Sequence, residues 1–249
     1  MKNYLSAILI ALLILGIASF ANMPGVRANV YAATGAAAFI DLPEDHWGYA
    51  FVDFAAINGI ISGYAMSDGK FKFMPENSVS KEEAITMIYR ALGASGKLKS
   101  IEDFSAKYQT ILDGSLIAPW ARKFTAYALE YKILSEEELK SFTTAEGAGL
   151  PAIREQAAVW TAKAIGGNLT PASTLPYSDV GSISTEALPY IELLYRLDVM
   201  KGDTQGRFLP KANIKRVEFA TIANRIFTAA KTTTNDTNKE VASYRGNIA

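Results

Sequence analysis

The sequence predicts an all-α protein that contains three copies of one helix–loop–turn–helix unit. Three observations predict this class: apolar stripes with helical spacing, the return of those stripes after a shift of 73 residues, and glycine-rich turns between them. Side chains at positions i, i+4, i+7 and i+8 line one face of an amphipathic helix. A pattern that returns at a fixed period indicates repeated structural units.

The first helix of each unit is predicted from one stripe. The stripes are Trp47, Phe51, Phe54 and Ala55 in the first copy, Trp120, Phe124, Tyr127 and Ala128 in the second, and Glu186, Tyr190, Leu193 and Leu194 in the third. In the first and third copies a glycine-rich turn follows, at 59–63 and 198–202. Glycine adopts positive φ without strain, so these turns are expected to end the helices.

The second helix of each unit is predicted from a second set of stripes. Their residues are Ala84, Met87, Ile88 and Ala91, then Ala157, Trp160, Thr161 and Ala164, then Phe219, Ile222, Ala223 and Ile226. Turns at 68–71 and 205–208 are expected between the two helices of the first and third copies. The middle copy has a run of acidic residues from Glu136 in place of the glycine turn, and Ser135 is expected to cap an extra helical turn there.

The predicted boundaries place the copies at 39–98, 101–168 and 175–230, with a flexible polar tail at 231–249 that is too polar to pack. Residues 1–32 are expected to be a signal peptide, because Lys2 precedes an apolar run at 5–20 and small residues at 30–32 suit a cleavage site. The alternative is a retained membrane anchor, but the run is short for a full span. We therefore expect a secreted protein with no membrane segment after cleavage.

Composition excludes several functional classes. The 25 basic and 25 acidic side chains cancel, so there is no broad cationic field to attract nucleic acid. The absence of cysteine excludes disulfides, thiolate metal sites and a cysteine nucleophile. The single histidine, His46, leaves few options for a histidine metal cluster or a general base. We expect no metal and no cofactor.

Short motifs recur in a fixed order along these copies. The first copy opens with the residues 39–43, followed by His46 and Trp47, and continues with the turn at 59–64 and with Phe71 and Pro75. A tetrapeptide opens each second helix, at 80–83, 153–156 and 215–218. From about Phe39 to Ala230 this order resembles the S-layer-homology (SLH) family, with three tandem repeats.

The resemblance implies both an architecture and a function. It implies a three-pronged assembly in which one helix of each repeat joins a central helix bundle. It also implies a non-enzymatic anchor that binds an acidic, commonly pyruvylated, secondary cell-wall polysaccharide in grooves between the repeats, at the cell wall or S-layer surface.

The second tetrapeptide residues, Lys81, Arg154 and Arg216, are the predicted ligand-binding cations. A carboxylate ligand suits a helix N-terminus, where backbone N–H groups are unpaired, and a cation adds a charge-assisted hydrogen bond. The alternative is structural: Ser80 and Glu83 fit a capping box, which leaves Lys81 facing water. Arg154 stands in the copy that lacks the cap residue and the glycine turn, which predicts a degenerate groove there.

Six further residues are candidates for the ligand site. Trp47 and Trp120 can stack on a sugar ring, although tryptophan at this spacing also fills cores. Gly63 and Gly202 allow a sugar to approach the backbone closely. Asp41 and Asp179 precede the first helices, where capping of a turn competes with ligand contact.

Two alternative functions remain open from the sequence. The protein can act as a structural S-layer or envelope component through contacts with a partner protein. It can also be a glycan-cleaving enzyme that uses Glu82 and Glu155, but a glycosidase needs two carboxylates held across one bond. No feature of the sequence fixes such a pair, so we expect no catalysis.

Overall fold

A computed structural model describes residues 35–169 and 175–229, and this part of the chain is mostly helical. The predicted signal peptide and polar tail lie outside the described residues. The helices are α2 (Tyr49–Ile57), α3 (Lys81–Ala94), α4 (Gln109–Gly114), α5 (Arg122–Glu130), α6 (Glu136–Leu139), α7 (Arg154–Ile165), α8 (Leu188–Arg196) and a C-terminal helix over 216–229. Short 3-10 turns lie at Ala36–Ala38, Pro119–Ala121 and Val180–Ser182. Two short strands, β1 (Tyr64–Ala65) and β2 (Phe71–Lys72), form an antiparallel hairpin that the sequence had indicated only as a turn.

The three second helices begin at the predicted tetrapeptides. In α3 the Ser80 hydroxyl accepts from the Glu83 backbone N–H at 3.1 Å, and the Glu83 carboxylate accepts from the Ser80 N–H at 2.9 Å. This capping box satisfies two donors that a helix start otherwise leaves unpaired. All twelve side chains of the predicted second-helix stripes are at most 9% exposed, so that prediction is confirmed.

The first helices begin later than the stripes predict. Trp47 and Glu186 lie in turns before α2 and α8, and Trp120 lies in a 3-10 turn before α5. In the first case the His46 imidazole holds the turn, because its Nδ1 accepts from the Gly48 N–H at 3.0 Å. The position that opens each stripe is therefore an entry turn and not a helical position.

A closed ring of three backbone hydrogen bonds joins the segments that lead into the second helices. The Val79 N–H donates to the Ile214 carbonyl at 2.9 Å, the Ile214 N–H to Ala152 at 3.0 Å, and the Ala152 N–H to Val79 at 2.9 Å. All three residues are fully buried. Because each donates to the next, the ring fixes the starts of α3, α7 and the C-terminal helix close together.

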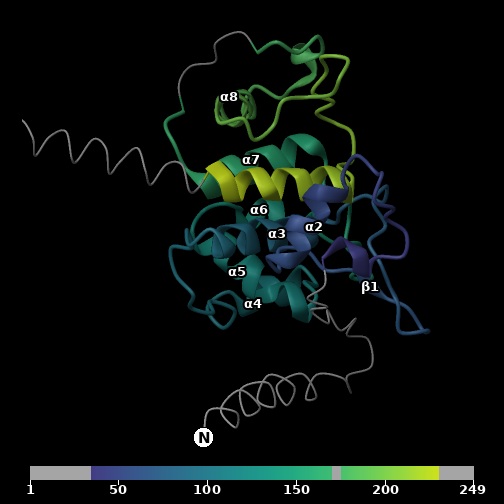
Figure 1. Cartoon of the computed structure of the whole chain (residues 1–249). Helices are drawn as coiled ribbons and strands as arrows, with labels where there is room; N and C mark the ends of the chain where they lie inside the picture. The colour runs from purple at the N-terminus through teal and green to yellow at the C-terminus, as the bar shows by residue number, and fades with distance from the viewer. Residues whose placement is uncertain (1–34, 170–174, 230–249) are drawn as a thin grey trace, which may run out of the picture.

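Each first helix packs on the second helix of a neighbouring segment. Helix α5 packs on α3, and α8 packs on α7. Helix α2 meets the C-terminal helix through Phe54 and Phe227, whose ring centroids are 5.0 Å apart. Figure 1 shows α3, α7 and the C-terminal helix in the middle of the molecule, with the first helices around them. The first helix of the N-terminal segment therefore packs on the last helix of the chain.

The middle segment departs from the other two. Ser135 caps α6 through a capping box with Glu138, as predicted. Helix α4 has no counterpart in the sequence-based prediction. Around α6, the side chains of Leu139, Phe142 and Trp160 are fully buried, so this segment fills with its own side chains the region where the others have a glycine turn.

Candidate ligand-binding site

The backbone ring places the start of each second helix, and so each predicted cation, against a neighbouring segment of the chain. The Lys81 N–H donates to Leu150 of the middle segment, and the Arg154 N–H donates to Ala212 of the C-terminal segment, both at 2.9 Å. The Arg216 N–H donates to Asn77 of the N-terminal segment, also at 2.9 Å. The side chains follow the same course, so Arg154 contacts Glu218 and Phe208 of the C-terminal segment and not its own segment.

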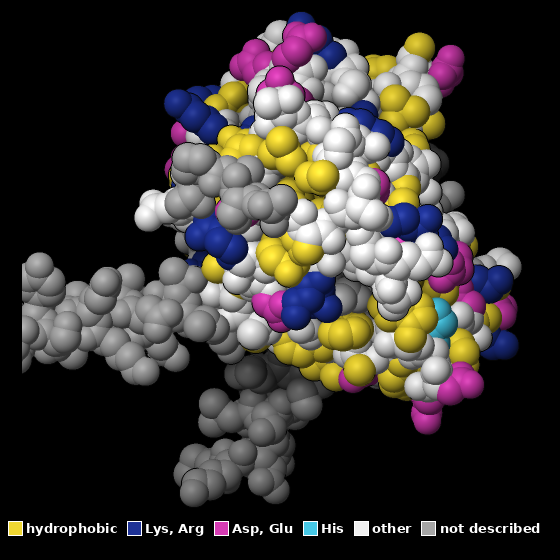
Figure 2. Space-filling model, turned by 90° about the horizontal axis from the view of Figure 1, so that it is seen from above, with side chains coloured by type: hydrophobic (Ala, Val, Ile, Leu, Met, Phe, Trp, Pro, Cys, Tyr) yellow, Lys and Arg dark blue, Asp and Glu magenta, His cyan; other side chains and the backbone are white. Residues whose placement is uncertain are grey.

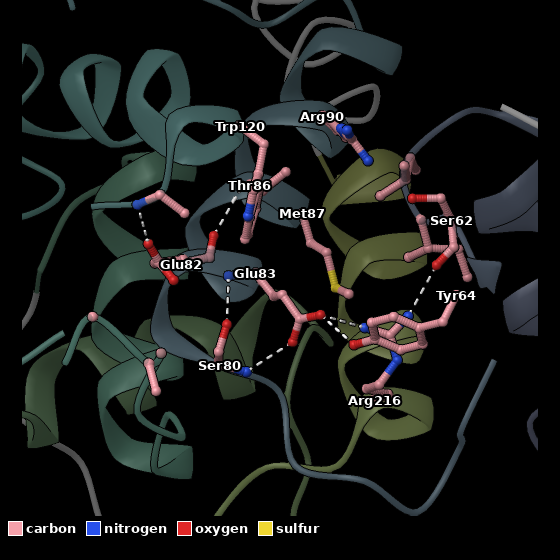
Figure 3. Close-up of a pocket in the computed structure, with 16 residues that line it drawn as sticks. Ser62, Tyr64, Ser80, Glu82, Glu83, Thr86, Met87, Arg90, Trp120 and Arg216 are labelled. Atoms are coloured by element: carbon pink, nitrogen blue, oxygen red, sulfur yellow. Dashed lines mark hydrogen bonds and ion pairs between the residues drawn. The ribbon is translucent and has the colours of Figure 1, made fainter. Parts of the chain in front are cut away.

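A pocket of about 460 Å³ lies beside α3 and is called the α3 pocket below. Its lining comes from three segments: the turn before β1, one face of α3, the entry turn of α5, the loop at 147–149, and Arg216. Figure 3 shows these side chains around the pocket. Of the three predicted cations, Arg216 alone is among its lining residues.

Arg216 forms the base of the α3 pocket and is only 2% exposed. Its guanidinium donates to the Phe73 carbonyl at 2.8 Å, to the Ser62 carbonyl at 3.0 Å, and to the Glu83 carboxylate at 3.0 Å. It also lies over the ring of Tyr64, 4.5 Å from the centroid. Three of the five N–H donors of the guanidinium are therefore used by described residues of the protein.

Glu83 holds this cation in place from α3. It accepts from Arg216, from the Tyr64 hydroxyl and from the Ser80 N–H. A buried ion pair with several hydrogen bonds resists displacement, because removal of one partner leaves a buried charge uncompensated. Glu83 thus combines the predicted capping role with the positioning of Arg216.

The opposite part of the α3 pocket carries Trp120 and Arg90. Trp120 is half-buried, and its ring forms part of the lining, so it presents an aromatic face of the type that stacks on sugars. The Arg90 guanidinium lies 5.4 Å from the centroid of the Phe124 ring. The sequence analysis did not single out Arg90, although its position about two and a half turns after the start of α3 places it near the helix start that carries the predicted site.

Glu82 is a lining residue that the sequence had considered only for catalysis. Its side chain is 4% exposed, and its Oε1 accepts from the Ala118 N–H at 2.9 Å. Burial raises the pKa of this carboxyl above its ordinary value, although the Ala118 hydrogen bond acts in the opposite direction. The other predicted glutamate, Glu155, lies on α7 and does not line the α3 pocket, so these two carboxylates do not share that pocket.

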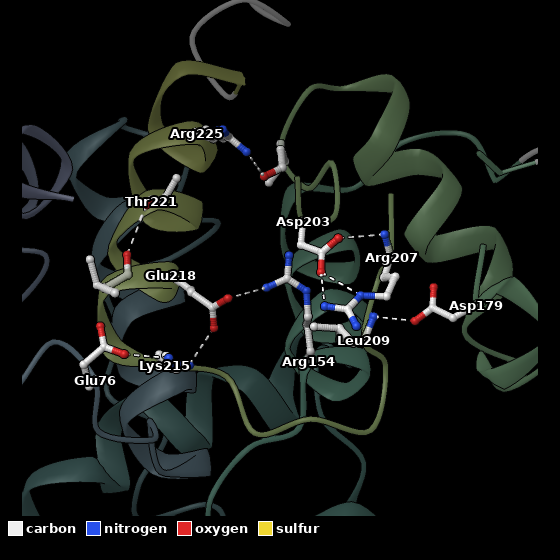
Figure 4. A network of polar contacts seen from close by, with 12 residues as sticks. Glu76, Arg154, Asp179, Asp203, Arg207, Leu209, Lys215, Glu218, Thr221 and Arg225 are labelled. Carbon is white, nitrogen blue, oxygen red and sulfur yellow. Dashed lines mark hydrogen bonds and ion pairs between the residues drawn. The ribbon is translucent and has the colours of Figure 1, made fainter. Parts of the chain in front are cut away.

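Arg154 lies in a second polar cluster, which we call the Arg154 site (Figure 4). Its guanidinium pairs with Glu218 at 3.3 Å and lies 5.4 Å from the centroid of the Phe208 ring. Its Nε is buried and has no hydrogen-bond partner among the described residues. Arg225 contacts the same region through the Val199 carbonyl at 3.3 Å. The cation, the acid and the second arginine correspond to Arg216, Glu83 and Arg90 of the α3 pocket.

Lys81 lies in a third cluster, the Lys81 site, which the protein fills itself. The ammonium group donates to the Ser141 carbonyl at 2.7 Å and to the Ser141 hydroxyl at 3.1 Å, and it lies 6.0 Å from the Phe142 ring centroid. Trp160 donates through Nε1 to Glu138 at 2.9 Å. Burial lowers the pKa of Lys81, with a partial opposing effect of Glu138. The described contacts of this predicted ligand-binding lysine are therefore all with the interior of the middle segment.

Trp47, Gly63 and Gly202 occupy different surroundings from those expected. Trp47 is 59% exposed and stacks on His46, next to Gly48, where any side chain would collide with Val217 of the C-terminal helix. Trp47 therefore lies at the edge of the C-terminal helix. A β-carbon at Gly63 would lie 2.5 Å from the Phe39 ring, so this glycine is required for packing.

Gly202 has φ +84°, and a β-carbon there would lie 2.7 Å from the Arg207 carbonyl and 2.8 Å from the Tyr177 ring. Packing of an aromatic ring therefore accounts for both glycines without a ligand.

Asp41 and Asp179 act as turn clamps. The Asp41 carboxylate accepts from the N–H groups of Phe73 and Met74, at 2.7 and 2.9 Å. The Asp179 carboxylate accepts from the two corresponding N–H groups, of Phe208 and Leu209, both at 2.8 Å. Met74 and Leu209 have positive φ, so each clamp stabilises a strained turn. Both oxygens of each carboxylate therefore accept a backbone N–H, as the capping interpretation expects.

Comparison with known proteins identifies one part of the chain. Residues 176–220 match the S-layer homology domain. S-layer homology domains generally bind cell-wall polymers, and this one implies association with the cell surface or cell wall. The match lies within the segment predicted as the third copy, 175–230.

A protein named an endoglucanase, from Bacillus sp. (strain KSM-635), is similar to most of the chain. It is 27% identical over 229 residues, which is 90% of this chain and 22% of the relative. The chain therefore spans about a fifth of the length of that relative.

The described surface carries charges of both signs. Basic and acidic side chains alternate over the face seen in Figure 2, without a large area of one sign. Over 35–169 and 175–229, no group of acidic and histidine side chains is arranged to hold a metal ion. In the same ranges, no helix has the length and apolar character needed to cross a bilayer.

Proposed function

We propose that the protein is a non-enzymatic cell-wall anchor that binds an acidic, pyruvylated secondary cell-wall polysaccharide in the α3 pocket. The observation that carries the proposal is the arrangement of Arg216, whose buried guanidinium is held by Glu83 at the base of a pocket that Trp120 and Arg90 also line. A fixed guanidinium suits a carboxylate such as that of a pyruvate ketal, and an aromatic face suits a sugar ring. A secreted protein with this pocket would attach to the outside of the cell.

We also infer that residues 39–230 comprise three tandem SLH repeats in a three-pronged assembly. The support is the ring through Val79, Ala152 and Ile214, together with three second helices that each begin at a tetrapeptide cation. Each cation donates its backbone N–H across a segment boundary at the same distance. Such a threefold correspondence is expected of repeats and is difficult to obtain from unrelated segments.

The Arg154 site is proposed as a second site of the same kind. It has the buried cation, the paired acid and the second arginine, and the exposed Trp47 lies near the same helix. The Lys81 site is excluded from the proposal, because its cation is bonded to Ser141 and Trp160 fills its interior. Two polysaccharide sites per chain are therefore expected.

An envelope protein with no carbohydrate ligand, acting through contacts between proteins, is the alternative. It predicts assembly of concentrated protein in the absence of polysaccharide. The exposed aromatic and apolar side chains of the described surface are scattered over several elements, which favours the polysaccharide ligand.

The test is retention of the protein on purified cell-wall material, with a matched pair of variants. Arg90→Gln removes a pocket cation, whereas Lys163→Gln changes the corresponding residue of α7 next to the filled site. Arg90→Gln should weaken binding about tenfold, the expected cost of one charge-assisted hydrogen bond. Lys163→Gln should bind like the unmodified protein. Failure of the unmodified protein to bind, or equal binding by both variants, would contradict the proposal.

A further inference from the structure

Glu82 and Glu155 occupy the same position of two corresponding helices. Each is the second residue of its helix, α3 or α7, and each is buried, with 4% and 7% exposure. Each accepts a backbone N–H from the entry turn of the next first helix, from Ala118 for Glu82 and from Ser184 for Glu155, both at 2.9 Å. The two carboxylates therefore have the same position on their helices and the same type of backbone donor.

Around Glu155, the remaining hydrogen-bonding capacity is filled by the protein. The Lys211 ammonium lies 2.9 Å from Oε1 and 3.0 Å from Oε2, and it also donates to the Ser184 hydroxyl at 2.8 Å. The Ser184 hydroxyl donates to the same carboxylate. Burial acts to raise the pKa of Glu155, but these bonds outweigh it, and the pKa lies below its ordinary value. This is a buried carboxylate with a complete set of partners.

Around Glu82, both of those side chains are missing. Register between the segments places Gly149 where Lys211 lies and Ala118 where Ser184 lies. The geometry agrees, because a β-carbon on Gly149 would be 2.9 Å from Glu82 Oε2. No described residue donates a hydrogen bond to that oxygen. Glu82 thus has one oxygen, Oε1, that accepts from the Ala118 N–H, and one, Oε2, that has no donor among the described residues.

The space left by the missing lysine is part of the α3 pocket. Glu82, Ala118 and the loop residues 147–149 all line it, as Figure 3 shows for the carboxylate. A group that enters the pocket therefore reaches the side of Glu82 where Glu155 has an ammonium group. A buried carboxylate without a cation or a full set of hydrogen bonds is costly, so an incoming cation gains affinity there.

We propose that Glu82 binds an ammonium group of the ligand, so that the α3 pocket selects an amino sugar whose amine is not acetylated. The inference rests on the proposed polysaccharide function and names a second requirement for the same site. The acidic group of the polysaccharide lies with the arginines, and the amine replaces Lys211 at Glu82. The four charged lining residues, Glu82, Glu83, Arg90 and Arg216, balance in charge, which suits a ligand that carries both signs.

Acetylation of the amine provides a direct chemical test. An acetamide has no charge, and it places an additional carbonyl and methyl group in the space that corresponds to a lysine ammonium. The buried carboxylate would then keep its desolvation penalty without a compensating ion pair. Affinity should therefore fall when the amines of the polysaccharide are blocked.

The experiment measures equilibrium binding to purified cell-wall polysaccharide of the source organism, before and after N-acetylation with acetic anhydride. The unmodified protein, Glu82→Gln and the matched control Glu155→Gln are compared. N-acetylation should weaken binding of the unmodified protein about tenfold or more, as expected for a charge-assisted pair. Glu82→Gln should show the same loss on the untreated polysaccharide and no further loss after acetylation. Glu155→Gln should behave like the unmodified protein, because its carboxylate already has Lys211.

Three outcomes would overturn the inference while the anchoring function stands. The first is equal binding of the unmodified protein to both forms of the polysaccharide. The second is full affinity of Glu82→Gln for the untreated form. The third is an equal loss by Glu82→Gln on both forms, which would show that Glu82 accepts from a hydroxyl. If the unmodified protein binds neither form, the anchoring function itself fails. Thermal unfolding of each variant shows that a loss of binding is not a loss of fold.

Discussion

The α3 pocket and the Lys81 site are built on corresponding backbones but have opposite interiors. In the α3 pocket a glycine turn and the small residues of 147–149 leave space above Arg216. In the Lys81 site, α6 replaces the glycine turn, and Trp160 and Phe142 are fully buried. The comparison teaches that one scaffold can make either an open site or a packed core, and that side-chain volume decides which.

The largest expected effect comes from Arg216→Ala. This change leaves Glu83 as a buried charge without its cation and leaves the carbonyls of Phe73 and Ser62 without a donor. The loss of one partner of a buried pair costs roughly 3–5 kcal/mol of unfolding free energy. Urea denaturation measures it. A cost below about 1 kcal/mol would show that Arg216 is not the structural base of the pocket.

Trp160→Phe tests the comparison between the α3 pocket and the Lys81 site by a change in the Lys81 site. The change removes the hydrogen bond to Glu138 and part of a fully buried ring. We expect a loss of roughly 1–3 kcal/mol in unfolding free energy, from the unsatisfied acceptor and the small cavity. Binding to cell-wall polysaccharide should not change. Weaker binding by a variant that remains folded would place a ligand in the Lys81 site.

Lys81→Met tests whether the lysine serves the interior. Methionine retains most of the apolar stem but leaves the Ser141 carbonyl without its ammonium donor. A loss of about 1 kcal/mol is expected, since burial already disfavours the charged form, as the lowered pKa of Lys81 shows. Polysaccharide binding, measured by co-sedimentation, should be unaffected. If Lys81→Met lowers the affinity for polysaccharide as much as Arg90→Gln does, the Lys81 site binds the ligand as the α3 pocket does.

The smallest effects are the pH dependences of Glu82→Gln and Glu155→Gln, and they have opposite signs. The pKa of Glu155 is lowered, so its contribution to stability is present above its unfolded pKa and is lost as the pH falls through the folded value. The pKa of Glu82 is raised, so its contribution is present below its unfolded pKa and is lost as the pH rises through the folded value.

At pH 7, Glu155→Gln should therefore be less stable than the unmodified protein by about 1 kcal/mol, the size of one hydrogen-bonded contact. Glu82→Gln should be equally stable or slightly more stable. Both differences should shrink as the pH falls and the carboxyl groups become protonated. Urea denaturation between pH 3 and pH 8 measures these differences, and two curves of the same sign would show that Glu82 has a partner in the unliganded protein.

The sequence predicted the local features of the fold well because their causes are local. The capping residues Ser80 and Ser135 lie next to the helices that they cap, and the second-helix stripes were all buried as expected. The late start of the first helices was missed, because Trp47 belongs to a turn held by His46. Helix α4 carries no stripe of the kind that revealed the other helices.

The site was harder to predict because its parts are distant in the chain. Arg216 belongs to a pocket of the first segment because of a backbone ring that links residues more than a hundred positions apart, and no local pattern reports that ring. Glu82 differs from Glu155 because Gly149 stands in place of Lys211 and Ala118 in place of Ser184. That difference was visible in the register between copies, but its meaning required the positions of both side chains.

The ring through Val79, Ala152 and Ile214 also has a consequence for the order of events in folding. Val79 obtains its acceptor only when Ile214 is available, and Phe54 of α2 obtains its aromatic partner from the C-terminal helix. A growing chain therefore holds its earliest helices without their final neighbours until almost all of it has been made. The ring therefore closes late, after the segment that contains Ile214 has been made.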